Sequence, residues 1–148
     1  METINIVIDK RQVPAGYVYC FNEACPKREE CLRWKVTQQI DPDLTIAKTV
    51  LPAVLSRPSC SYFRKAEQKV MAWGFTTLFA EVKSKDEADL RQQIKTFLGG
   101  NGTYSRYKSG QRLLSPAQQE HILDLFRKRG YSEGLEFDHY VMVYDFDH

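Results

Sequence analysis

Long hydrophobic runs are absent from the 148-residue sequence: no stretch approaches the roughly 20 consecutive apolar residues of a membrane-spanning helix. The start of the chain also lacks the basic region and the long apolar stretch of a secretory signal. We therefore expect a soluble, cytoplasmic protein with no membrane partner. No G-x-x-x-x-G-K string followed by Ser or Thr is present, which excludes a typical phosphate-binding loop.

Histidine is scarce, with three residues in the chain. None of them has a neighbouring Cys or Ser at a spacing typical of a nucleophilic pair. A pair of Cys60 with His121 or His139 would depend on the fold alone, because these residues are far apart in the sequence. We predict no catalytic residues and a non-enzymatic protein.

Cysteine is scarce too, but its four residues are grouped as Cys20, Cys25, Cys31 and Cys60. The spacing is C-x4-C-x5-C-x28-C, and four thiolates are what a structural zinc ion or a small iron–sulfur cluster requires. Disulfides are rare in the cytoplasm, where metal-bound or free thiols are common. We predict that the four thiols share one site, which holds zinc if metal is bound.

Three alternatives to a zinc site remain open. The first is an iron–sulfur cluster. The first two intervals, of four and five residues, are wider than is usual for paired zinc ligands, and a Cys-Pro pair such as Cys25-Pro26 also occurs in ferredoxin-type runs. In a redox-active protein the thiols themselves would be the functional atoms. In the last interpretation the cysteines bind nothing and act as small hydrophobic residues.

Charge is distributed unevenly along the chain. Residues 91–114 carry five cations and no Asp or Glu, whereas residues 115–148 carry seven acids and three cations. Such asymmetry is typical either of a polyanion-binding face or of a basic segment that pairs with an acidic one inside the fold. The second interpretation is favoured, because the whole chain has a net charge of only +2.

Residues 104–112 interleave aromatic and cationic side chains around a Ser-Gly turn, which predicts a β-hairpin. Such a hairpin can stack on bases and contact phosphates, so a protein or nucleic-acid partner is expected there. The residues that would carry this contact are Tyr104, Arg106, Tyr107, Lys108 and Arg112. The simpler interpretation is a solvated hairpin whose cations meet the acidic C-terminal region.

Periodicity and turn residues predict strands over 4–8, 17–19 and 140–144, and helices over 26–35, 62–72, 84–98 and 115–130. The third helix has a capping box from Ser84 and ends at Gly99, and the fourth has a capping box from Ser115. Segments 45–55 and 75–82 fit either a strand or a helix. The fold expected is α+β, with at least three helices packed on a small, mainly antiparallel sheet.

One domain over residues 1–148 is the economical interpretation, because no repeat, low-complexity tract or long linker interrupts the chain. Its two halves differ in character. Residues 1–63 form a cysteine-rich half and residues 64–148 an α+β half.

Several segments resemble a family of small bacterial proteins of unknown function. They are residues 20–26, 31–33, 60–64, 97–104 and 107–116. The resemblance implies a compact single domain and carries no activity or site residues with it. From the cysteines and the segment over 104–112 we expect an interaction module with a structural cysteine site. The alternatives are a redox or cluster protein and a nucleic-acid-binding protein.

Overall fold

The computed structural model describes residues 7–146, so the expected strand over 4–8 lies mostly outside the described residues. Internal contacts divide the chain into two compact units. Unit 1 consists of residues 1–69 and 143–148, and unit 2 consists of residues 70–142. The prediction of one domain with halves at 1–63 and 64–148 stays a prediction.

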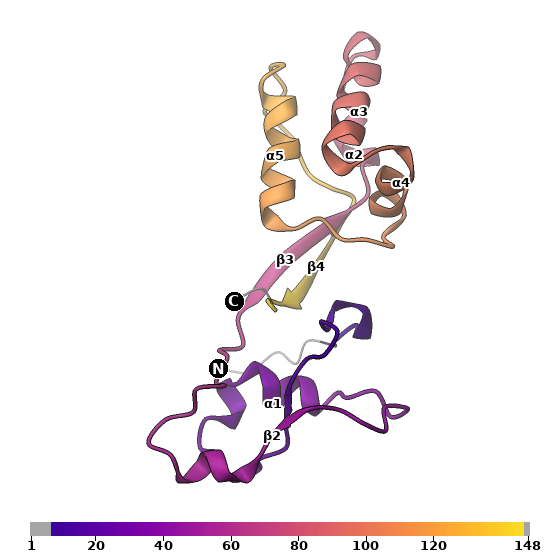
Figure 1. Ribbon diagram of the computed structural model, residues 1–148. Coiled ribbons are helices and arrows are strands. Elements are labelled where there is room, and N and C mark those ends of the chain that lie inside the picture. Colours follow the sequence, from indigo (N-terminus) through magenta and orange to yellow (C-terminus); the bar gives the residue numbers. More distant parts are fainter. Residues whose placement is uncertain (1–6, 147–148) are drawn as a thin grey trace. The chain divides into compact units, whose positions relative to one another are not determined.

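Unit 1 consists of short elements joined by irregular segments (Figure 1). In chain order they are η1 (Lys10–Gln12), β1 (Tyr19–Cys20), η2 (Arg28–Glu30), α1 (Leu32–Thr37), β2 (Thr49–Val50) and η3 (Pro52–Ser56). Strands β1 and β2 pair in parallel. The helix expected over 26–35 is in fact two pieces, because the backbone at Cys31 is extended and caps α1.

Strands β3 (Gln68–Trp73) and β4 (His139–Tyr144) pair as a two-stranded antiparallel ribbon, and the boundary between the units falls within both strands (Figure 1). The helix expected over 62–72 is therefore wrong. The last strand was predicted correctly. Burial alternates along the middle of β3, as a strand with one packed face requires.

Unit 2 is helical apart from its part of this ribbon. Its helices are α2 (Thr76–Phe79), α3 (Ser84–Leu98), α4 (Asn101–Ser109) and α5 (Pro116–Arg127). Helix α3 has the predicted extent and ends at Gly99, whose φ of 98° suits a left-handed cap. The capping box expected at Ser84 is wrong, because α3 begins one residue earlier than that motif needs and Lys83 is its N-cap.

The capping box of α5 is confirmed. The Ser115 hydroxyl accepts a hydrogen bond from the backbone N–H of Gln118, whose side-chain oxygen accepts one from the Ser115 N–H at 2.9 Å. The hairpin expected over 104–112 is wrong. Most of that segment is helix α4, and Gly110, with a φ of 86°, ends the helix instead of forming a hairpin turn.

The two units have cores of different size. Twelve buried residues form the main cluster of unit 2, in which the rings of Phe75 and Tyr104 stack at 4.9 Å. The corresponding cluster in unit 1 has three buried members, which are Leu32, Val36 and Tyr144. Unit 1 is thus the part of the chain with little hydrophobic core to stabilise it.

The structure confirms the predicted α+β class. The small sheets are one antiparallel and one parallel pair, so the expectation of one mainly antiparallel sheet is not met. Within residues 7–146, no helix has the length and apolar character to cross a bilayer.

Candidate functional site

The four cysteines of unit 1 line one cavity of about 250 Å³. Cys20 ends β1, Cys25 lies in the following loop, Cys31 caps α1 and Cys60 lies in the loop after η3. Cys31 is buried, and the other three are partly exposed. Four thiols that come from four different segments thus face the same small space.

Polar contacts hold the first of these segments in place. The backbone N–H of Cys20 donates to the Thr37 hydroxyl at 3.0 Å, which ties β1 to the end of α1. Asn22 is buried, and its amide nitrogen donates to the carbonyl oxygens of Val50 and Leu51, both at 3.4 Å. The loop that carries Cys25 therefore leaves β1 beside the end of β2.

Backbone hydrogen bonds bring the chain after Cys60 against the start of α1. The N–H of Leu32 donates to the carbonyl oxygen of Arg64 at 2.6 Å, and Cys31 forms an isolated antiparallel bridge with Lys65. The N–H of Phe63 in turn donates to the carbonyl oxygen of Cys60 at 3.3 Å. These contacts bring the segment that follows Cys60 beside the backbone of Cys31.

Arg33 joins the segments around the cavity through its guanidinium group. It donates to the carbonyl oxygen of Tyr62 at 2.7 Å and to that of Val18 at 2.9 Å. Its carbon Cζ lies 5.3 Å from the ring centre of Tyr17. One α1 side chain thus links the strand that leads to Cys20 with the loop that follows Cys60.

The charged residues that line the cavity are all basic. Its lining includes Lys27, Arg28, Arg33 and Arg57, and none of the described lining residues is Asp or Glu. Cations next to thiols stabilise the thiolate form, which is the form that binds metals. The wall thus suits a group with net negative charge, such as a metal ion held by four thiolates.

The pKa of the Cys20 thiol is raised, mainly by burial. Burial raises the pKa of its thiol, and a hydrogen bond with the backbone of Asn22 opposes the rise. Negative charge on Cys31, Cys25 and Cys60 raises the pKa further. A bound cation would act in the opposite direction and lower the pKa.

The sulfur atoms do not stand in a finished coordination sphere. Among residues 7–146, no group of three or more His, Cys, Asp or Glu side chains is arranged to hold a metal ion. The thiolates of a zinc site lie about 2.3 Å from the metal. An ion in this cavity would therefore draw the cysteine loops inward.

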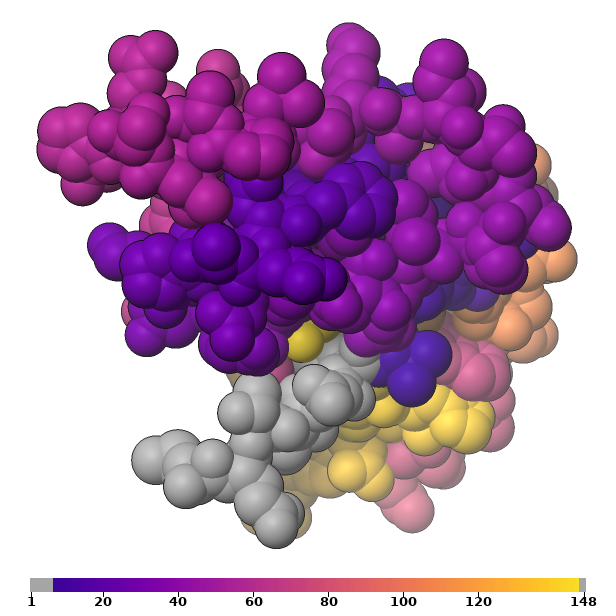
Figure 2. Space-filling model, turned by 90° about the horizontal axis from the view of Figure 1, so that it is seen from below, coloured from indigo at the N-terminus to yellow at the C-terminus, as the bar shows by residue number. Residues whose placement is uncertain are grey.

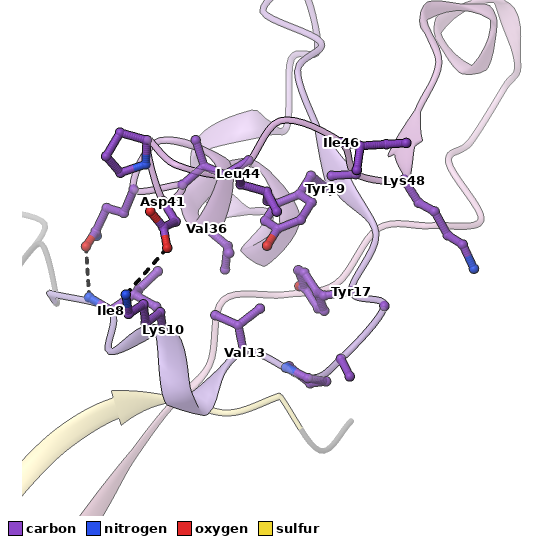
Figure 3. A pocket seen from close by; sticks show the side chains of 17 residues that line it. Ile8, Lys10, Val13, Tyr17, Tyr19, Val36, Asp41, Leu44, Ile46 and Lys48 are labelled. Atoms are coloured by element: carbon purple, nitrogen blue, oxygen red, sulfur yellow. Dashed lines mark hydrogen bonds and ion pairs between the residues drawn. The ribbon is translucent and has the colours of Figure 1, made fainter.

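A second hollow in unit 1 has a volume of about 710 Å³ and is open to solvent (Figure 3). Apolar and aromatic side chains from β1, α1 and the loop before β2 line it, and an ion pair of 3.6 Å between Lys10 and Asp41 lies at one side. None of the predicted site residues lines it. The hydroxyl of Tyr17, a lining residue, is buried without a hydrogen-bond partner among the described groups.

The residues predicted to contact a partner lie in unit 2. Tyr104 and Tyr107 are buried, with exposed fractions of 7 % and 5 %, so their rings do not form a stacking surface. Arg106, Lys108 and Arg112 are exposed. The sequence pattern thus combined core residues and surface residues into one motif.

Sequence reasoning missed the contribution of Arg33 and of the basic wall. A cluster of cations does follow the cysteines, at Lys27, Arg28 and Arg33, and three of the four cavity cations could be found in that way. No local sequence pattern predicts the hydrogen bonds from Arg33 to the backbone carbonyl groups.

The comparison with known proteins gives a family and no function. No curated protein and no solved structure matches the chain. One family, described as a family of unknown function, matches residues 1–146. The chain with this cysteine-lined cavity therefore belongs to the family of unknown function DUF6078.

Proposed function

We propose that unit 1 is a metal-binding module in which Cys20, Cys25, Cys31 and Cys60 hold one zinc ion, and that the site is structural. The observation that carries the proposal is the convergence of all four cysteines of the chain on one cavity. Four protein ligands close a tetrahedral zinc site, so that no position is left for a substrate. The zinc would accordingly be structural and not catalytic.

The small core of unit 1 supports a structural role. Its main cluster has three buried members, its strands have two residues each, and its only α-helix among the described residues has six. Domains with too little core need a metal or covalent links between segments to be stable. A zinc ion shared by four segments would supply such links, and in zinc-finger peptides metal binding contributes roughly 10–16 kcal/mol.

The chemistry of the lining restricts the metal. Thiolates favour zinc and iron–sulfur clusters, whereas magnesium and calcium require carboxylate or carbonyl oxygen ligands. The cavity has thiols and cations but no lining carboxylate among the described residues. Zinc bound by four thiolates carries a net charge of −2, which the basic wall offsets.

The proposal is tested by metal analysis of the anaerobically purified chain. We expect one zinc per chain and a colourless protein. Each single Cys→Ser variant at positions 20, 25, 31 and 60 should lose zinc and melt at a lower temperature. Ser59→Ala is the matched control, because Ser59 lines the same cavity without a thiol, and this variant should keep its zinc.

Three results would contradict the zinc assignment. A brown protein with iron and broad visible absorption would mean that the thiols hold a cluster. A metal-free chain of unchanged stability in all four Cys→Ser variants would mean that the cysteines bind nothing. A reversible disulfide formed in preference to zinc uptake would favour the redox interpretation.

A further inference from the structure

The cysteine cavity of unit 1 adjoins another hollow of about 670 Å³, and the two have part of their lining in common. The residues that line both are Val50, Val54, Arg57, Pro58, Ser59 and Tyr62. In Figure 2 the magenta part of the chain that includes them lies beside the indigo part around residue 20. We call the two adjoining hollows the unit 1 groove.

The unit 1 groove is positively charged. Its lining cations are Lys27, Arg28, Arg33, Lys48 and Arg57, and none of its described lining residues is Asp or Glu. The sequence has the same bias, because no acid occurs within residues 44–66. Arg28 pairs with the neighbouring Glu29 at 3.7 Å. The charge of the cations exceeds the −2 of a zinc ion held by four thiolates, so a filled metal site would leave the groove attractive to anions.

Three of these cations are exposed and free of acidic partners. Among residues 7–146, no ion pair involves Lys27, Lys48 or Arg57. The Nζ atom of Lys27 lies 5.4 Å from the ring centre of Phe63, the residue after Tyr62. Cations without an intramolecular partner are the ones that can contact an anionic ligand.

An exposed aromatic ring accompanies these cations. Tyr62 lines both hollows, and 51 % of it is exposed. Its backbone is held in place, because its carbonyl oxygen accepts the 2.7 Å hydrogen bond from Arg33. Proteins that bind single-stranded nucleic acids combine such rings, on which bases stack, with cations that follow the phosphates. The buried rings of Tyr104 and Tyr107 in unit 2 lack this property.

We propose that the unit 1 groove binds single-stranded nucleic acid, with a base on the Tyr62 ring and phosphates at Lys27, Lys48 and Arg57. The proposal rests on the proposed function in one respect, namely that zinc would hold the walls of the groove in place. A single strand fits because its bases can turn outward onto an aromatic ring, whereas a duplex keeps its bases paired and stacked. An acidic peptide would match only the charge of the groove.

Fluorescence anisotropy with a labelled oligouridylate of about twelve nucleotides tests the proposal on the full chain. Three neutralised phosphates predict a slope of log affinity against log salt of about −2. Lys27→Gln combined with Lys48→Gln and Arg57→Gln should weaken binding at low salt by roughly a hundredfold or more and flatten this slope. Tyr62→Ala should weaken binding by about 5- to 150-fold, whereas Tyr62→Phe, which keeps the ring, should bind within about threefold of the natural chain.

The matched control combines Arg106→Gln, Lys108→Gln and Arg112→Gln, which removes the same charge from unit 2. It should bind within about threefold of the natural chain, provided that its melting curve shows a folded protein. Equal loss of binding in the two triple variants would overturn the proposal. Binding of a duplex as tight as that of the single strand, or displacement by an acidic peptide as effective as that by unlabelled oligouridylate, would overturn it too.

Zinc content, measured on the same samples, separates this proposal from the zinc assignment. A zinc-loaded natural chain that binds neither oligouridylate nor oligothymidylate at low salt would overturn nucleic-acid binding and leave the zinc site standing. A zinc-free chain that binds the single strand with the expected loss in Tyr62→Ala would support the groove and contradict the zinc site alone.

Discussion

The guanidinium of Arg33 donates a hydrogen bond of 2.7 Å to the carbonyl oxygen of Tyr62, 29 residues further along the chain. A second bond from the same group reaches Val18, 15 residues earlier. Arg33 therefore restrains the two segments that carry the first and the last cysteine. The cavity depends on this side chain as well as on the thiols that line it.

Arg33→Ala should lower the free energy of unfolding of unit 1 by about 2–3 kcal/mol, because two hydrogen bonds from a charged donor are lost. Zinc retention should fall with it. The measurement is urea unfolding together with metal content. Arg57→Ala is the matched control, since Arg57 is an exposed cation in the same cavity lining, and its loss should change stability by less than about 0.5 kcal/mol. Equal effects of the two variants would contradict the restraining role of Arg33.

Tyr17→Phe should leave stability unchanged or raise it by up to about 1 kcal/mol, because the Tyr17 hydroxyl is buried without a described partner. Burial raises the pKa of Tyr17 to about 12, against the lowering influence of Arg33. A spectrophotometric titration should therefore lose one late-titrating tyrosine in the variant. Tyr131→Phe serves as the contrast, because the Tyr131 hydroxyl donates to Asp86 at 2.6 Å, and it should cost about 1 kcal/mol.

Asp138→Asn should destabilise unit 2 by about 1 kcal/mol at neutral pH. The Asp138 carboxylate accepts hydrogen bonds from the backbone N–H groups of Thr77 at 2.7 Å and Thr76 at 3.0 Å, at the start of α2. Burial raises the pKa of Asp138, but these bonds outweigh it, so that the pKa is below the usual 3.8.

The sign of the pH dependence follows from this lowered pKa. The stabilisation is fully present above the unfolded pKa of 3.8 and is lost as the pH falls through the lower folded value. The free energies of unfolding of the natural chain and of Asp138→Asn, measured in urea, should therefore approach each other below about pH 4. Glu133→Gln, at an exposed carboxylate, should show no such difference. A difference that stays constant with pH would contradict the prediction.

Gly110→Ala should lower the free energy of unfolding by more than the roughly 1–2 kcal/mol that a left-handed backbone costs an alanine. The reason is that the added Cβ would lie 2.9 Å from the Trp73 ring. Gly130→Ala provides the comparison, because Gly130 has a φ of +90° and nothing within 4 Å of the added atom. The second variant should show the strain alone. Thermal melting of both separates the two contributions, and equal melting temperatures would contradict the steric part.

Helix ends with a clear local signal could be predicted from the sequence. Helix α5 starts at a capping box from Ser115, and α3 stops at the left-handed Gly99. Ser109 and Gly110 led to the wrong prediction of a hairpin, because a glycine in the left-handed conformation can end a helix as well as form a hairpin turn. The spacing of Tyr104 and Tyr107, three residues apart, was the helical signal that could have corrected it.

Long-range pairing could not be predicted from the sequence. Segment 62–72 carries apolar residues close to a helical period, yet its second part is strand β3. There Ala72 pairs with Leu114, and the strand also pairs with β4, about seventy residues away. The grouping of the thiols followed from their spacing, whereas the choice of Arg33 as the side chain that holds their segments required the fold.

The course of the chain through β3 and β4 bears on how the two units could be gained or lost in evolution. Unit 2 is one continuous segment, whereas unit 1 is made of two pieces that flank it. Because both ends of that segment lie on neighbouring strands, which run about 5 Å apart, a tight turn would be enough to rejoin the flanking pieces. The helical segment thus has the form of an insertion, and its gain or loss would leave every cysteine codon untouched.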